Sequence, residues 1–204
     1  MFRPPCGAAN ARTTRSGRAF FHVLQQLRSN AMQIASTMAA GRGDTDQLLF
    51  SLARSLMAQG LRVCGTVQIN TDRQKTDPCD MDVRVLPEGP TIRISQDLGA
   101  GAAGCRLDTG ALEAAVGHVA AALERGADVL IVNKFGKHEA EGRGFRPVIA
   151  EALARDIPVL VGVNGLNQAA FEAFTEGFGE QLPADATILE DWLIARSRAA
   201  EAAM

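Results

Sequence analysis

From Met32 onward, the chain alternates between two patterns of apolar residues. Short apolar runs bounded by glycine or polar residues predict strands, whereas apolar residues spaced three and four positions apart predict helices. The predicted strands span residues 32–38, 61–69, 81–86, 91–95, 128–132 and 157–163. Helices are predicted over 48–57, between a cap at Asp108 and Gly126, around Pro147 as a first-turn residue, and over 167–178 and 190–203.

This order of elements predicts an α/β fold with three layers and a mostly parallel sheet. Residues 87–90 (Pro-Glu-Gly-Pro) join the third and fourth predicted strands as a hairpin, which is an antiparallel insertion in the sheet. The most apolar strand, 128–132, is expected to be central and covered on both faces. Ligands of such sheets bind beyond the carboxyl ends of the strands, where the loops 38–45 and 133–143 fall.

The composition is that of a globular protein: 47% of the 204 residues are hydrophobic and 22% are charged. No apolar run approaches the roughly 18 residues that indicate a transmembrane helix. Residues 1–31 contain five arginines and no acid, whereas the remainder carries 16 basic and 23 acidic residues, a net charge of −7. An acidic body argues against nucleic-acid binding. We expect residues 1–31 to be a flexible basic extension and residues 32–204 to be a single α/β domain.

Four cysteines lie far apart, without the paired spacing of a zinc site: Cys6, Cys64, Cys79 and Cys105. A domain of this size does not need disulfides to fold. We therefore expect a reducing, cytoplasmic environment and no metal site.

The loop 38–45 follows a predicted strand and precedes a helix, as the phosphate-binding loop GxxxxGK[ST] does. Gly43 and Thr45 match that pattern, but Met38 stands at its first glycine and Asp44 at its lysine. An aspartate repels the phosphate that a lysine attracts, by about 4 kcal/mol at about 4 Å and an effective dielectric of about 20. Ordinary ATP hydrolysis at this loop is therefore not expected.

Two interpretations of this loop stay open. Its backbone N–H groups and the helix N-terminus can bind an anion, with Arg42 adding positive charge. Alternatively, Asp44 caps the helix while Gly41 and Gly43 only permit a tight turn.

The loop after the most apolar strand concentrates cations. Lys134, Lys137, Arg143 and Arg146 fall within residues 133–146, together with two glutamates. Such a charge run is commonly a solvated face, yet its position at the carboxyl edge of the sheet also favours an anion site.

A strand followed by Gly136-Lys137-x-Glu139 resembles the DEIGKME segment of a P-loop nucleoside triphosphatase family. Asn133 and Lys134 stand where that family has its two carboxylates, the first of them the Walker B aspartate. The resemblance implies a sheet of the P-loop nucleoside triphosphatase type whose catalytic carboxylates are missing.

Two longer segments, 79–99 and 131–153, make the chain similar to a bacterial family known only as a domain of unknown function. The resemblance extends from Met32 to the C-terminus, and it implies a P-loop-like domain over 32–204. Members of that family tend to be encoded beside molybdate-transport and nitrogenase-related genes. The resemblance thus implies a metabolic setting and no activity.

Two weaker groupings complete the candidates. Residues 79–82 (Cys-Asp-Met-Asp) could ligate a metal, but alternation along a strand also makes them a solvated sheet face. Arg106, beside the glycine-rich stretch 96–107, could reach an anion. No nucleophile with an adjacent base follows from the spacing, so no catalytic residue is assigned.

These observations predict a cytoplasmic accessory or regulatory protein that binds a nucleotide, with Mg²⁺, or a tetrahedral oxyanion such as molybdate. The expected site consists of Gly41, Arg42, Gly43, Asp44, Thr45, Lys134, Lys137, Arg143 and Arg106. The link to molybdenum metabolism is implied by the resemblance alone. The expected partner is a small anionic ligand, with no nucleic acid and no membrane, and a homo-oligomer stays open.

Two other functions remain alternatives. One is a nucleoside triphosphatase-like hydrolase with a rearranged site, in which Thr45 binds Mg²⁺ and Lys134 or Lys137 replaces the missing lysine. The other is an interaction protein that binds no ligand.

Overall fold

The sheet that the sequence predicts is present in the computed structural model of the chain, which describes residues 33–71, 80–96 and 106–201. The chain divides into residues 1–32 and 33–204, and the description below concerns the second unit. The expectations for residues 1–31 and for most of the glycine-rich stretch lie outside the described residues.

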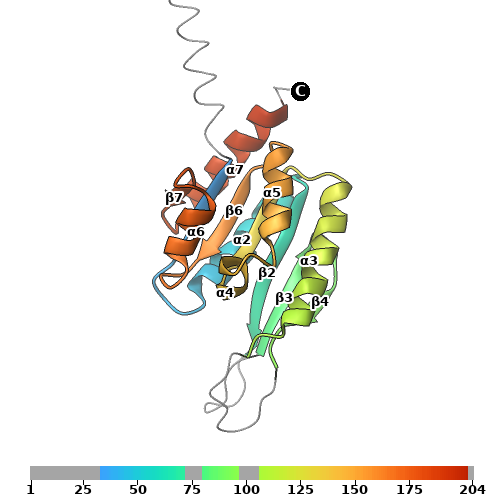
Figure 1. Ribbon diagram of the computed structural model, residues 1–204. Helices are drawn as coiled ribbons and strands as arrows, with labels where there is room; N and C mark the ends of the chain where they lie inside the picture. The colour runs from blue at the N-terminus through green and yellow to red at the C-terminus, as the bar shows by residue number, and fades with distance from the viewer. Residues whose placement is uncertain (1–32, 72–79, 97–105, 202–204) are drawn as a thin grey trace, which may run out of the picture. The chain divides into compact units, whose positions relative to one another are not determined.

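Strands and helices alternate along this unit (Figure 1). In chain order they are β1 (Ile34–Thr37), α2 (Asp44–Ala58), β2 (Val63–Thr71), β3 (Asp80–Leu86), β4 (Thr91–Arg93), α3 (Thr109–Glu124), β5 (Val129–Phe135), α4 (Lys137–Ala140), α5 (Arg146–Ala154), β6 (Val159–Val163), α6 (Gln168–Phe174), β7 (Glu180–Leu182) and α7 (Ala186–Glu201).

The strands form one sheet in the order β4-β3-β2-β5-β6-β1-β7. β1, β2, β5, β6 and β7 are parallel, whereas β3 pairs antiparallel with both β2 and β4. The mostly parallel α/β sheet with an antiparallel insertion is therefore confirmed. The most apolar strand, β5, is the middle strand of the seven, as expected.

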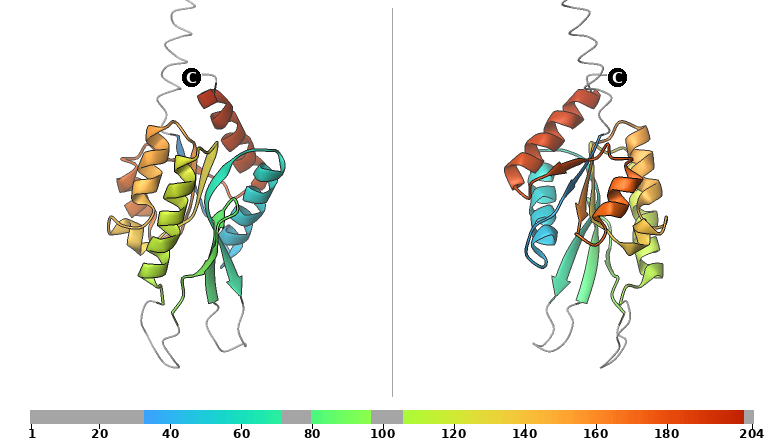
Figure 2. Two further views of the ribbon diagram at one scale, coloured as in Figure 1. Left: turned by 90° about the vertical axis from the view of Figure 1, so that its right-hand side faces the viewer. Right: turned by 60° about the vertical axis from the view of Figure 1, so that its left-hand side comes forward.

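Helices cover both faces of the sheet (Figure 2). α2 and α7 pack against each other on one face, and α3, α5 and α6 lie on the other. Under the first face, Leu49, Leu52, Leu56, Leu189 and Leu193 are at most 1% exposed. Burying each of these side chains stabilises the fold by roughly 1.5–3 kcal/mol relative to exposure. None of the helices in the described ranges has the length and apolarity to cross a bilayer.

The second half of the sheet differs from the sequence prediction at several element ends. β5 extends to Phe135 because its ring packs against Phe171 and Phe174 of α6, with centroids 5.4 and 5.6 Å apart. The short helix α4 occupies a segment expected to be loop. α6 ends at Phe174, before the predicted end at residue 178, and Phe178 is 62% exposed.

The sequence pattern also does not indicate β7, which has three residues and no apolar run. α7 begins at Ala186, before the predicted start at residue 190. The reason is Asp185, whose carboxylate accepts the N–H groups of Thr187 and Ile188 at 2.9 and 3.0 Å and so caps the helix.

Gly162 in β6 determines how β5 reaches the carboxyl edge of the sheet. A Cβ at this position would lie 2.1 Å from the Asn133 carbonyl oxygen. The pairing of the two strands shifts register between Val132 and Phe135, around this close approach. The absence of a side chain at Gly162 therefore allows Asn133 to take its place at the strand end.

We expect Gly162→Ala to lower the free energy of unfolding by about 1–3 kcal/mol, because the added methyl group would overlap a backbone oxygen in a packed sheet. Gly117→Ala is the matched control: a Cβ there meets nothing within 4 Å on the exposed side of α3. It should stabilise the protein by about 0.5–1 kcal/mol. Urea denaturation followed by circular dichroism measures both, and equal effects would contradict the close approach.

Candidate functional site

The chain leaves two neighbouring strands in opposite directions at the carboxyl edge of the sheet. β1 and β6 lie side by side, but β1 is followed by α2 on one face and β6 by α6 on the other (Figures 1 and 2). In α/β sheets, such a topological switch point is where ligands bind. The turn between β1 and α2, expected to be part of a site, lies at this switch point.

Contacts among its own residues hold the β1–α2 turn in shape. The Ala39 N–H donates to Thr45 Oγ1 at 2.9 Å, and Gly43 is the helix N-cap with a φ of 86°. The Asp44 carboxylate packs against Gly41, where a Cβ would lie 2.1 Å from Oδ2. The interpretation of Asp44 as the N-cap is therefore wrong. The cap conformation is left-handed, which glycine adopts without strain, so the cap falls on Gly43 and α2 begins at Asp44.

A buried hydroxyl without a partner lies at the base of this turn. Thr37, the last residue of β1, is 1% exposed, and its Oγ1 makes no hydrogen bond to any described residue. Alternation along the strand puts Thr37 on the same face as Ala35, which packs in the core shared with α2. Buried polar groups are nearly always hydrogen-bonded, so this hydroxyl indicates a water or ligand partner.

A buried polar network ties the first turn of α2 to β2 and β5. The carboxylate of Asp46, which is 7% exposed, accepts hydrogen bonds from the amides of Asn133, Asn70 and Gln68 at 2.7, 2.6 and 3.4 Å. Asn133 Oδ1 in turn accepts the backbone N–H of Gln68 at 2.9 Å. Three amides thus compensate one buried carboxylate, and they fix the N-terminus of α2 against the sheet.

The sequence analysis did not identify Asp46, Gln68 or Asn70. A partial signal was present, because Asp46 lies three residues before Leu49, on the apolar side of the predicted helix. Gln68 interrupts an apolar strand at its carboxyl end. What the sequence could not provide was the pairing of these residues with Asn133, which depends on the order of the strands.

The network engages the residue that stands, by resemblance, at the Walker B position. The Asn133 side chain is already bonded to a carboxylate and to a backbone N–H. Over the described ranges, no three His, Cys, Asp or Glu side chains gather where they could hold a metal ion. The place expected for a magnesium-binding carboxylate is therefore occupied by an amide in a satisfied hydrogen-bond network.

The Gly136-Lys137-x-Glu139 motif forms a helix cap. Glu139 is 2% exposed, and its carboxylate accepts the N–H groups of Gly136 and Phe145 at 2.9 and 3.2 Å. Gly144 passes so close that a Cβ would lie 2.1 Å from Glu139 Oε1. The glutamate therefore holds both ends of the segment that contains α4, and the motif has a structural role here.

His138 connects the same segment to α3. Its Nε2 lies 2.6 Å from Oε1 of Glu113, which also accepts the Gly144 N–H at 3.1 Å. The hydrogen bond with His138 is the main cause that lowers the pKa of Glu113. His138 is 5% exposed, so the contact anchors α4 from its buried side.

Two of the expected anion-binding cations share a carboxylate on α4 and just after it. Lys137 Nζ lies 3.7 Å and Arg143 Nη2 lies 2.5 Å from the Glu141 carboxylate. The hydrogen bond from Arg143 is the main cause that lowers the pKa of Glu141. All three side chains are exposed, and water screens such pairs strongly, so they hold the cations weakly.

The remaining expected residues fall into two places. Arg42 is exposed in the β1–α2 turn, and Lys134 is exposed next to Asn133, which the Asp46 network joins to that turn. Arg106 donates to the Gln96 carbonyl at 3.2 Å beside the β4 edge. Five strand spacings, about 24 Å, separate that edge from β1. The structure therefore does not bring Arg106 to the turn.

The two aspartates considered as metal ligands, Asp80 and Asp82, both contact an arginine. Arg93 contacts the carboxylates of Asp80 and Asp82, each at 2.7 Å, across the β3–β4 pairing. Cys79 lies outside the described residues. The expected solvated face is wrong at Asp80, which is 7% exposed, because both carboxylates are covered by their contacts with Arg93.

The chain belongs to the family described as "Protein of unknown function (DUF2478)", whose model matches residues 34–192. This confirms the resemblance to a family of unknown function. The chain is also 36% identical, over 160 residues, to the molybdenum import ATP-binding protein ModC 2 of Bradyrhizobium diazoefficiens. That similarity covers 78% of this chain and 18% of the relative, so the chain spans less than a fifth of that protein. No solved structure matches the chain.

Asn133→Asp should destabilise the protein at neutral pH. It replaces an amide that donates a hydrogen bond to Asp46 with a second carboxylate, which cannot donate and repels the first. We expect the free energy of unfolding to fall by about 1–3 kcal/mol in urea denaturation at pH 7. Repulsion raises the pKa of the pair in the folded state, so the loss should shrink as the pH falls toward about 4 and one carboxyl takes up a proton.

The exchange variant Asp46→Asn/Asn133→Asp is the control, because it restores one carboxylate and one amide. It should recover most of the loss caused by Asn133→Asp. A double variant whose destabilisation equals the sum of the two single variants would show that the side chains do not interact.

Proposed function

We propose that this chain is an accessory protein of molybdenum metabolism that binds a small tetrahedral oxyanion at the β1–α2 turn. The observation that carries the proposal is the buried, unpartnered Thr37 hydroxyl at the base of a turn that leads into a 15-residue helix. The N-terminus of a helix attracts anions through its backbone N–H groups and its dipole. The metabolic setting is supported by the similarity to a molybdenum import ATP-binding protein.

A small oxyanion suits this turn better than a nucleoside triphosphate. A P-loop binds triphosphate and Mg²⁺ with a lysine and a metal-holding carboxylate. Asp44 stands at the position of the lysine, and Asn133 stands at that of the carboxylate, hydrogen-bonded to Asp46. A tetrahedral dianion needs only backbone N–H groups, a hydroxyl and nearby positive charge. The domain is thus, in this proposal, a P-loop-like sheet that keeps the anion site and lacks the hydrolytic groups.

Cations around the turn supply the charge in this proposal. Arg42 lies in the turn itself, and Lys134 follows the residue that the Asp46 network holds. Lys137 and Arg143 contribute from the α4 segment, since their exposed contacts with Glu141 are weak enough for a dianion to compete. Asp44 opposes binding, so its carboxylate must turn away from Gly41 when the anion enters.

The test is Thr37→Val, which removes the orphaned hydroxyl and keeps the side-chain volume. Without ligand, the variant should be at least as stable as the wild type, because no hydrogen bond within the described protein is lost and a buried polar group is removed. Molybdate binding, measured by calorimetry with tungstate, sulfate and ATP as comparisons, should weaken about fivefold or more. Asp44→Asn should strengthen it, because a repulsive charge is removed.

Two controls match these variants. Thr175→Val removes a buried hydroxyl that donates to the Phe171 carbonyl at 3.1 Å, so it should destabilise the fold and leave anion affinity unchanged. Asp156→Asn removes an exposed carboxylate after α5, at the opposite edge of the sheet, where asparagine also tolerates the φ of 56°. The proposal fails if no oxyanion binds below millimolar concentration, or if each control matches its test variant in affinity.

Turnover of ATP or GTP with Mg²⁺ should be slow or absent, because the groups at positions 44, 133 and 134 are not those of a phosphoryl-transfer site. Phosphate release from the full chain, measured with and without Mg²⁺, checks this. Turnover on the order of 1 s⁻¹, as in ordinary kinases, would instead support the hydrolase with a rearranged site.

A second candidate, an interaction protein, is favoured by two exposed apolar residues at the same switch point. Met38 and Leu166, in the loops after β1 and β6, are 41% and 93% exposed. The similar segment in the molybdenum import relative is one part of a much longer polypeptide, so a covalently joined or separate ATP-binding partner suits this surface. Failure of all oxyanions to bind would leave this candidate as the better explanation.

A further inference from the structure

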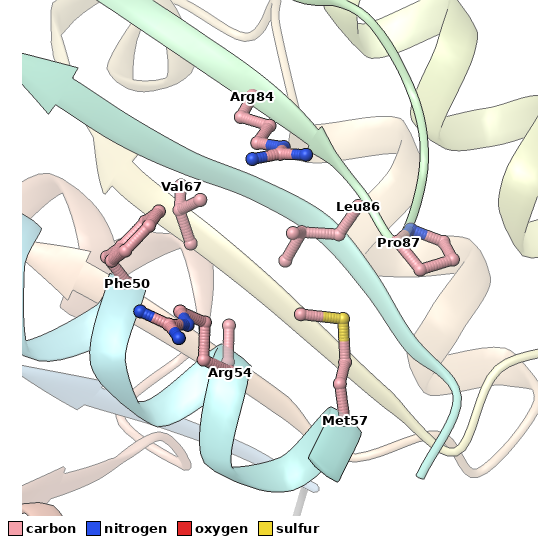
Figure 3. Close-up of a pocket in the computed structure, with 8 residues that line it drawn as sticks. Phe50, Arg54, Met57, Val67, Arg84, Leu86 and Pro87 are labelled. Carbon is pink, nitrogen blue, oxygen red and sulfur yellow. The ribbon is translucent and has the colours of Figure 1, made fainter. Parts of the chain in front are cut away.

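A groove separate from the β1–α2 turn opens between α2 and the β2–β3 part of the sheet (Figure 3). Its volume is about 340 Å³, and its lining includes Phe50, Arg54 and Met57 from α2, Val67 from β2, and Arg84 and Leu86 from β3. α2 packs on β2 and β5, whereas α3 packs on the opposite face of β2, β3 and β4. The main contacts of α2 with the sheet therefore end at β2, and the groove lies where the same face continues onto β3.

The floor of the groove is apolar. Val67 and Leu86 are 1% and 3% exposed, and the half-buried Phe50 and Met57 stand beside them (Figure 3). The apolar surface that water still reaches is on Phe50, Met57 and Pro87, and it can bind the apolar part of a ligand because contact removes both surfaces from water.

Two arginines face this floor from opposite walls, Arg54 from α2 and Arg84 from β3 (Figure 3). In the described part of the chain, neither forms an ion pair; Arg54 only approaches the Phe50 ring, with its guanidinium carbon 6.0 Å from the centroid. Other arginines of the same ranges do pair with carboxylates: Arg62, Arg93, Arg143, Arg155 and Arg196. The groove therefore combines an apolar surface with two uncompensated guanidinium groups.

Two acids on this face of β3 are engaged by another arginine. Alternation places Asp80, Asp82 and Arg84 on one face of β3. Both aspartates contact Arg93, so the chain supplies Arg93 with two carboxylates and Arg84 with neither. The complementary occupant is an anion.

An inorganic oxyanion would satisfy the arginines and leave the apolar surface of Phe50, Met57 and Pro87 in water, whereas an uncharged apolar molecule would do the reverse. We propose that the groove binds an organic anion with an apolar body and one acidic headgroup. The headgroup, a carboxylate or a phosphate, lies between Arg54 and Arg84 and accepts forked N–H bonds. The body lies against Phe50, Met57 and Pro87, above the buried Val67 and Leu86. This site is independent of the oxyanion site proposed above.

The test uses the full chain with decanoate and decyl phosphate as probes in calorimetry. Both should bind in the micromolar to low millimolar range, while decyltrimethylammonium, which has the same body and the opposite charge, should bind at least tenfold more weakly. Arg54→Gln and Arg84→Gln should each weaken decanoate binding about tenfold or more. Arg198→Gln is the control, because it removes an exposed arginine near the end of α7 and should change nothing.

Methionine methyl resonances locate the bound probe. Met57 lines the groove and Met38 lies at the switch point, so decanoate should shift the Met57 signal and leave the Met38 signal in place. Molybdate should not displace decanoate, and Thr37→Val should not alter its affinity, so this proposal and the oxyanion site can fail separately.

The proposal is overturned if neither probe binds below ten millimolar, if the cationic probe binds as well as decanoate, or if the double arginine variant keeps full affinity with an unchanged melting temperature. Displacement of the probe by molybdate alone would also overturn it, because the groove would then be an inorganic anion site. Binding of decyl phosphate but not decanoate would support it and define the headgroup.

Discussion

The hydrogen bond between the Asp46 carboxylate and the Asn133 amide holds helix α2 to the sheet at the carboxyl ends of its strands. It links the first turn of α2 to the middle strand of the sheet, and Gln68 and Asn70 extend it to β2. Because Asp46 is buried, removing its amide donors would leave a desolvated charge, which costs far more than an ordinary hydrogen bond contributes. The position of the β1–α2 turn, and with it any ligand site there, depends on this compensation.

The same arrangement departs from the motif of the P-loop nucleoside triphosphatases that the sequence resembles. A carboxylate and an amide are both present at the carboxyl edge, but the carboxylate is on the helix and the amide is on the strand. The Asp46 carboxylate therefore has a structural role, and it accepts hydrogen bonds from three side-chain amides. Glu139 shows the same change of role, since its carboxylate caps α4 and receives two backbone N–H groups. A residue that matches a catalytic motif, such as Glu139, can therefore have the structural role of binding backbone N–H groups.

Periodicity predicted the sheet and its helices because the buried strands and the apolar sides of α2 and α3 repeat regularly in the sequence. It did not indicate β7 or α4, which are short and depend on tertiary partners: β7 pairs with β1, and α4 is held by Glu139 and Glu113. It placed the two loops correctly at the carboxyl edge, since that follows from strand direction alone. The contacts within the site could not be derived from the sequence. The contact between Asn133 and Asp46 depends on the strand order β2-β5-β6-β1, which the sequence pattern does not give.

α2 connects the two regions that carry the proposals. Its N-terminus follows the β1–α2 turn, and its later residues Phe50, Arg54 and Met57 form a wall of the groove. The helix has 15 residues and is about 22 Å long, so its two ends lie well apart. Amides of β2 and β5 fix its first turn to the sheet through Asp46, so a ligand at one end of the helix leaves the contacts at the other end in place. One helix can thus border two separate sites, and substitutions in its later turns can alter the groove while the turn before it keeps its shape.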